Sequence, residues 1–110
     1  MSVTISEPFV VGEIPAPLQY NFLDASGEPI DLSGFAAKFS LRERNGAAST
    51  YNATVTSPTV GEVTYQWTGA EFATSGHYRA EFWVGNGIHR YASVDILFDV
   101  AVSVGPVPQI

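Results

Sequence analysis

From residue 35 onward, apolar side chains recur at every second position of the chain. The alternation runs through 35–42, 51–56, 63–67, 78–84 and 88–100, with turn-forming residues between these segments. Successive side chains of an extended strand point to opposite faces, so this pattern predicts strands with one buried face. The largest side chains on the predicted inner face are expected in the core: Phe39, Tyr65, Trp67 and Phe82.

Two further strands are predicted upstream, at Val3–Ser6 and Leu18–Leu23, although three prolines interrupt the segment between them. Thr68–Gly76 is too short for a stable helix and is predicted to form a loop with one helical turn. The pattern predicts an all-β single domain, an immunoglobulin-like antiparallel β-sandwich of about seven strands. The predicted organisation is an N-terminal extended arm at 1–17, the sandwich at 18–100 and a C-terminal extended tail at 101–110.

The register of the last hairpin has two interpretations. A two-residue turn over 86–87 would pair Val84 with His89, whereas a three-residue loop over 85–87 would pair Val84 with Ile88. A slip of one residue moves every side chain of a strand to the other face. We predict the three-residue loop because it keeps the apolar residues together, although the Asn-Gly dipeptide favours the shorter turn.

The outward face of this hairpin is the candidate interface. Trp, Tyr and Arg are enriched among the residues that anchor protein interfaces. The candidates are Trp83, His89 and Tyr91, with Arg79 and Glu81 beside them. The alternative is that the N-terminal arm or the loop at 69–75 covers this face.

The charge of the chain is unevenly distributed. Its 110 residues carry a net charge of −6, with no Lys or Arg among the first 37 residues. That stretch holds five acids: Glu7, Glu13, Asp24, Glu28 and Asp31. Acidic proteins repel phosphate, so we expect binding neither to nucleic acid nor to an anionic membrane. The acids serve solubility, or they meet a basic surface on a partner.

Candidate chemistry is sparse. The chain has no cysteine, which excludes disulfides and thiolate metal sites. The two histidines, His77 and His89, fall at opposite ends of the hairpin, too far apart to share a metal ion. Asp95 and Asp99 are roughly 13 Å apart on one strand face, and Asp24–Glu28 is interpreted as a turn rather than a calcium loop. We therefore expect no enzyme activity and no cofactor.

The N-terminus lacks the basic and apolar segments of a signal peptide, and no apolar run is long enough to span a membrane. These features favour a protein that is made in the cytoplasm. The lack of cysteine fits a reducing compartment of that kind.

Two stretches of the chain carry a family resemblance. One is LDASGEPIDLSGF at 23–35, in which a glycine turn and a proline precede an Asp-Leu-Ser-Gly corner, followed by FSLR at 39–42. The other is SGHYRAEF at 75–82, followed by RY at 90–91 and FDV at 98–100. Together they resemble the immunoglobulin-like domain at the N-terminus of phage baseplate upper proteins and of related tail proteins.

The resemblance covers residues 21–100 and implies a non-enzymatic structural module of a phage tail, baseplate or neck. Its implied partners are other virion structural proteins, and it implies a homo-oligomer located in the virion. The chain ends soon after the domain, without the receptor-binding part of the best-known members. The competing hypothesis is a carbohydrate-binding module in which Trp83 and Tyr91 form one stacking platform.

Overall fold

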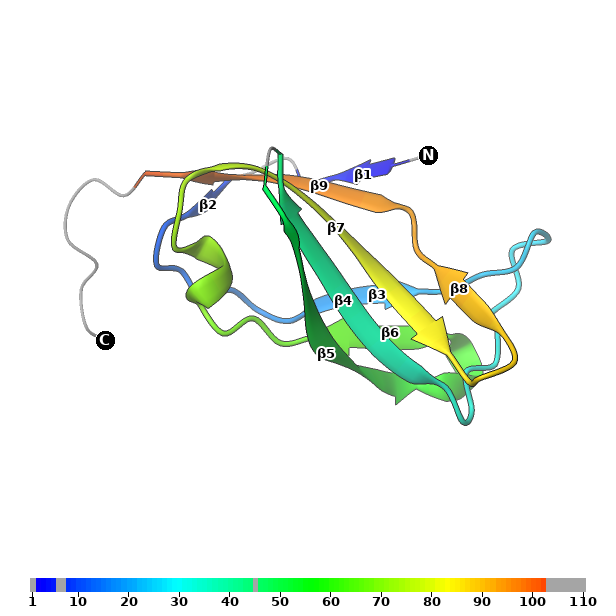
Figure 1. Cartoon of the computed structure of the whole chain (residues 1–110). Helices are drawn as coiled ribbons and strands as arrows, with labels where there is room; N and C mark the ends of the chain where they lie inside the picture. The colour runs from blue at the N-terminus through cyan, green and yellow to red at the C-terminus, as the bar shows by residue number, and fades with distance from the viewer. Residues whose placement is uncertain (1, 6–7, 45, 103–110) are drawn as a thin grey trace.

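The computed structural model describes residues 2–5, 8–44 and 46–102, almost all of them in strands, turns and short loops. The strands are β1 (Ser2–Thr4), β2 (Phe9–Val10), β3 (Leu18–Asn21), β4 (Ala36–Glu43), β5 (Ala48–Ser57), β6 (Glu62–Tyr65), β7 (Gly76–Gly85), β8 (Arg90–Ala92) and β9 (Asp95–Ala101). Two 3-10 turns, η1 (Pro58–Val60) and η2 (Ala70–Phe72), complete the set. The all-β single domain is confirmed, as is the one helical turn in the loop before β7 (Figure 1).

The strands form one curled sheet in the order β1-β9-β7-β4-β5-β6-β3. Strand β5 makes the curl because it changes partner along its length. Up to Ala53 it pairs with β4, and from Thr54 it pairs with β6. The sheet thereby folds back on itself, so that β4 and β7 pass over β3 and β6 in Figure 1.

Aromatic side chains fill the space between the two layers. Phe39 of β4 stacks on Tyr65 of β6 with ring centroids 4.2 Å apart, and Trp67 meets Phe39 edge to face. Phe82 of β7 stacks with Tyr20 of β3. The four predicted core residues are all buried, which confirms the inner face inferred from the period-two pattern.

The described part of the expected N-terminal arm is extended and lies on its own domain. Strands β1 and β2 pair with β9 in parallel, so the sheet is mixed, while its other pairings are antiparallel. Phe9 inserts its ring among Trp67, Phe72 and Phe98, at centroid distances of 5.8, 4.8 and 5.4 Å. The packing of this partly buried ring against the core holds β2 on the sheet. The predicted strand end at Ser6 and the tail beyond residue 102 lie outside the described residues.

The predicted register of the last hairpin is wrong, and so is its alternative. Gly85 pairs with Arg90 and Val84 with Tyr91, which leaves a four-residue loop. The side chain of Asn86 closes this loop, because its Oδ1 accepts hydrogen bonds from the amides of Ile88 and His89. Local side-chain bonding of this kind competes with the short Asn-Gly turn.

Candidate interaction surface

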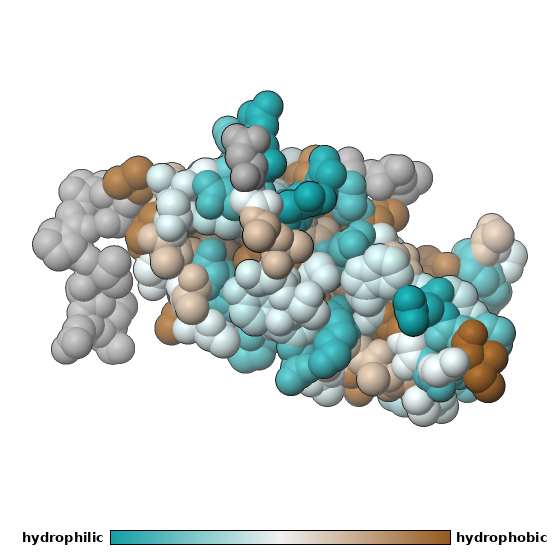
Figure 2. Space-filling model, viewed as in Figure 1, coloured by the Kyte–Doolittle hydropathy of each residue, from teal (hydrophilic) through white to brown (hydrophobic). Residues whose placement is uncertain are grey.

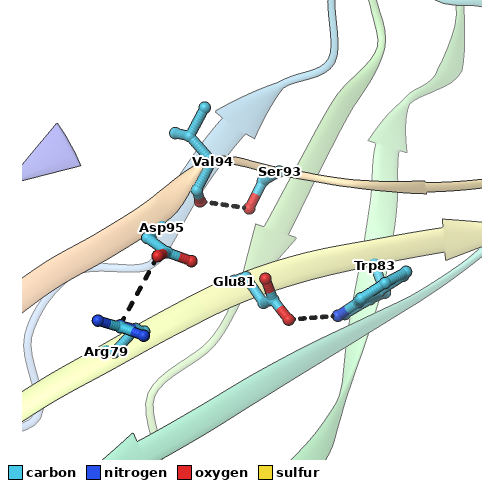
Figure 3. A network of polar contacts seen from close by, with 6 residues as sticks. All are labelled: Arg79, Glu81, Trp83, Ser93, Val94 and Asp95. Carbon is cyan, nitrogen blue, oxygen red and sulfur yellow. Dashed lines mark hydrogen bonds and ion pairs between the residues drawn. The ribbon is translucent and has the colours of Figure 1, made fainter. Parts of the chain in front are cut away.

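Three of the five predicted interface residues share the outward side of β7. Arg79, Glu81 and Trp83 alternate with the buried Tyr78, Ala80, Phe82 and Val84. Figure 3 shows two of their contacts: Trp83 Nε1 donates to Glu81 Oε1 at 2.8 Å, and Arg79 Nε lies 3.7 Å from Asp95 Oδ2. Trp83 is 36% exposed, so neither the described part of the arm nor the loop at 69–75 covers it.

The other two predicted residues lie on the opposite side. Tyr91 is paired with the buried Val84, so its ring turns inward, and it stacks on Phe35 at 6.0 Å. His89 stacks on Tyr91 at 6.3 Å. The expected cluster of Trp83 with Tyr91 is therefore wrong, and these two rings cannot form one stacking platform for a sugar.

The cause of this error is a break in the alternation at Ser93. Its backbone amide donates to the carbonyl of Phe82, and its Oγ accepts from the amide of Phe82. Residues 93–94, between β8 and β9, interrupt the regular pairing with β7. Before them, odd positions such as Tyr91 face the core, and after them, even positions such as Ile96 do. The sequence signal for such a break was Arg90, a charged side chain at a predicted inward position between Ile88 and Ala92.

The outward side of the sheet also gathers the positive charge of the whole chain. The chain has five Lys and Arg residues. Lys38 and Arg42 point outward from β4, Arg79 from β7 and Arg90 from β8, and Arg44 follows directly after β4. We call this surface the basic face. The sequence shows the acidic N-terminal third but not this basic face, because the register of β4, β7 and β8 brings its cations together.

A groove of about 520 Å³ crosses one end of the basic face. It is lined by, among others, Arg42, Arg44, His77, Arg79, Leu97 and Asp99. Arg42 is paired directly opposite Arg79, an arrangement that costs stability because like charges face each other. His77 Nδ1 lies 2.6 Å from Asp99 Oδ1, so part of the local negative charge is already engaged. We call this the basic groove.

A smaller hollow of about 280 Å³ continues from the groove along the sheet. It shares Arg42 and Arg79 with the groove and adds Ser40, Glu81 and Asp95. Figure 2, viewed from the side where β4 and β7 lie in front of β3, shows mostly hydrophilic and neutral residues. Apolar side chains appear there only as separate areas.

Within residues 2–5, 8–44 and 46–102, the one buried carboxylate belongs to the scaffold. Glu71 is 4% exposed, and its oxygens accept hydrogen bonds from the Thr68 amide and hydroxyl, the Gly69 amide and the Tyr65 hydroxyl. Burial raises the pKa of Glu71, but these hydrogen bonds outweigh it and hold the pKa below the ordinary value of 4.5. The pKa of the Tyr65 hydroxyl is raised by burial and by its bond to this carboxylate. The arrangement fixes the loop before β7.

The carboxylate of Asp24 organises the loop between β3 and β4. It accepts hydrogen bonds from the amides of Ser26 and Glu28 and from the Ser26 hydroxyl, as expected for a turn. In the described ranges, no group of three or more His, Asp or Glu side chains is placed to hold a metal ion. None of the helices in the same part of the chain has the length and apolar character needed to cross a bilayer.

The fold and this surface define a small β-sandwich module with a charged outward face. The chain belongs to the family of the BppU N-terminal domain, the N-terminal domain of the phage baseplate upper protein, whose family model matches residues 23–105. This match confirms the resemblance carried by the motifs at 23–35 and 75–82.

Two solved structures share the fold. One is the N-terminal domain of phage TP901-1 ORF48, with a TM-score of 0.59 and 14% identity, covering 92% of this chain and 93% of that chain. The other is CopC from Methylosinus trichosporium OB3b, with a TM-score of 0.55 and 16% identity, covering 93% and 91%. No curated protein sequence matches the chain. The family match therefore carries the functional argument, and the two structures support the fold.

Proposed function

We propose that this chain is a non-enzymatic structural module of a phage tail or baseplate, which joins virion proteins through its outward sheet face. The observation that carries the proposal is the match of the baseplate-protein family to residues 23–105. The exposed basic face, with Trp83 and Arg79 at its centre, supports a role in protein contacts.

The distribution of polar groups supports a binding role rather than catalysis. The buried carboxylate of Glu71 is fully used in holding a loop, and the two histidines are held on separate parts of the surface. The basic groove is an open hollow whose lining includes three arginines, with His77 and Asp99 beside them. Grooves of this kind recognise carboxylates by charge and by the forked geometry of the guanidinium group.

The test is the protein composition of purified virions of the phage that encodes the chain. Quantitative mass spectrometry should find the chain at several copies per virion, in a fixed ratio to other tail proteins. Electron microscopy of particles made without the gene should show tails that lack part of the baseplate. Virions that assemble with complete tails and contain none of the chain would contradict the proposal.

The proposed contact face has its own test. Trp83→Ala should leave the fold intact, because Trp83 lies outside the core, but should lower the amount of chain incorporated into particles. The matched control is Ile88→Ala, which removes an even more exposed apolar side chain (85%) from the adjacent hairpin loop. Equal incorporation of both variants would remove Trp83 from the contact.

A further inference from the structure

The cations of this chain lie together on one side of the sheet, although Glu81, Asp95 and Asp99 lie among them, and the loop between β3 and β4 carries acids and no base. All five Lys and Arg residues belong to the basic face, while Asp24, Glu28 and Asp31 lie in the loop between β3 and β4. We call residues 23–31 the acidic loop. Its three acids are exposed, and no Lys or Arg precedes residue 38.

The acidic loop is held in one shape with its charges outward. Asp24 Oδ1 bonds the amides of Ser26 and Glu28, and Leu23 forms a bridge with Pro29 across the base of the loop. Asp31 Oδ1 accepts from the amide and hydroxyl of Ser33. Hydrogen bonds to the serine hydroxyls, followed by those to backbone amides, lower the pKa of both aspartates. A preordered anionic loop loses little entropy when it binds.

The basic groove has the complementary features. Arg42 faces Arg79 across two strands, and Arg44 lines the same groove. An anionic occupant would relieve the repulsion between these cations. Ile5 and Leu97 give the groove an apolar component. Leu23, which is 53% exposed at the base of the acidic loop, offers a matching apolar side chain.

The groove and the acidic loop of one molecule are at opposite ends of the sheet. The groove lies at the Gly76 end of β7, whereas the loop leads into Ala36, which pairs with Gly85 at the other end. Nine residue steps along a strand span roughly 30 Å. Figure 1 shows the loop, in cyan, projecting from the end of the molecule at which β8 lies. A loop in this position can reach only the groove of another molecule.

We propose that the basic groove binds the acidic loop of a second copy of this chain in a head-to-tail contact. The two surfaces differ, so the contact is heterologous and repeats into a ring or an open row of subunits. This inference rests on the proposed structural function, for which it supplies the self-contact. A second copy is the chosen partner because the basic groove and the acidic loop of the same chain have complementary charges.

The experiment uses two complementary variants of the full chain. The groove variant, Arg42→Glu with Arg79→Glu, reverses the groove and keeps the acidic loop. The loop variant, Asp24→Asn with Glu28→Lys and Asp31→Asn, reverses the loop charge but keeps the oxygens that accept its internal hydrogen bonds. Sedimentation velocity at about 100 μM protein in low salt would measure the association, since screening weakens it at high salt.

The wild-type chain should associate beyond a dimer in low salt, and each variant alone should raise the dissociation constant by about tenfold or more. An equimolar mixture of the variants should form heterodimers, because one partner supplies an intact loop and the other an intact groove. The control, Lys38→Glu with Arg90→Glu, makes the same charge change on the same face outside the groove and should associate like the wild type.

A wild-type chain that remains monomeric under these conditions overturns the self-contact. The same conclusion follows if the mixture stays monomeric while circular dichroism shows both variants folded, or if the control is as defective as the groove variant. None of these results affects the composition of virions. A chain that is monomeric in solution yet present in particles would retain the proposed function and lose this interface.

Discussion

At the residue scale, Gly61 shows how one position without a side chain lets neighbouring segments of the backbone approach closely. It ends η1 with φ at +68°, and a Cβ placed there would lie 2.5 Å from the Phe22 carbonyl oxygen and 2.9 Å from that of Ile30. Its own carbonyl accepts the Phe22 amide at 2.8 Å. Glycine is therefore required here both by backbone conformation and by the close approach of another segment.

An alanine in the left-handed conformation costs about 1–2 kcal/mol. We expect Gly61→Ala to lower the free energy of unfolding by more than this, because the added methyl group also meets backbone oxygens. The matched control is Gly87→Ala, which has φ at +91° and nothing within 4 Å of the added methyl group. Urea unfolding of both variants would separate the conformational cost from the steric cost. Equal losses would contradict the close approach.

The hydrogen-bonded carboxylate of Glu71 is the second residue-scale feature. Glu71→Gln should lower the free energy of unfolding by about 1–3 kcal/mol at pH 7, because one acceptor oxygen becomes a donor facing other donors. Glu28→Gln, at an exposed position, is the control.

The loss of unfolding free energy in Glu71→Gln should depend on pH. The folded pKa of Glu71 is below its ordinary value of 4.5, so its stabilisation is fully present above 4.5 and disappears as the pH falls through the folded pKa. The difference between wild type and Glu71→Gln should therefore shrink as the pH falls below 4.5 and through the folded pKa. Urea unfolding across this range would measure it, and a pH-independent difference would contradict the role of the ionised form.

At the element scale, the connection between β8 and β9 sets which side chains face the core. Ser93 bonds Phe82 of β7 through both its amide and its Oγ, and Oγ also donates to the Val94 carbonyl at 2.9 Å. The side chain substitutes for a ladder bond where the pairing is interrupted. Downstream of it, β9 resumes with Ile96, Phe98 and Val100 buried.

Ser93→Ala should cost about 1–3 kcal/mol, because the amide of Phe82 loses the side-chain oxygen that accepts its hydrogen bond in the buried interior. The control is Ser49→Ala, an exposed position on β5. Hydrogen exchange at the Phe82 amide would check the mechanism independently of global stability. Unchanged protection of that amide in the variant would show that Oγ does not hold it.

At the scale of the whole molecule, the order of strands sets the distribution of stability. β4 and β7 occupy the centre of the longer layer and pair along eight consecutive positions. β1, β2 and β8 have two or three residues each and pair with a single neighbour. Short strands at the margin open locally more easily than central strands, which open only with the whole domain.

Native-state hydrogen exchange should therefore show the slowest amides in β4 and in the middle of β7, at positions such as Phe39 and Phe82. The amides of β8 and of β1 should exchange through local opening, at rates that depend little on denaturant. Protection of β1 equal to that of β4 would indicate that the N-terminal strands open only with the global unfolding of the domain. The measurement thereby also tests how firmly β1 is attached to β9.

The fold was largely readable because burial in strands obeys a strict period of two. That period correctly predicted the inward faces of β4, β6 and β7, while the residue types of 24–28 correctly predicted the turn built on Asp24. It failed at Tyr91, because a single bulge inverts the faces of everything between it and the turn. It also could not show that β1 and β2 pair with β9, since Ser2 and Asp95 are paired across more than ninety positions of the chain.

The sequence by itself determined the class of fold, the composition of the core and the unequal charge of the two parts of the chain, because these depend on residue type and local alternation. The tertiary structure decided which outward residues are neighbours. Arg42, Arg79 and Arg44 form one groove only because β4 and β7 pair in a register that places two arginines opposite each other. Strand register is set by packing across the whole core, and local sequence does not encode it.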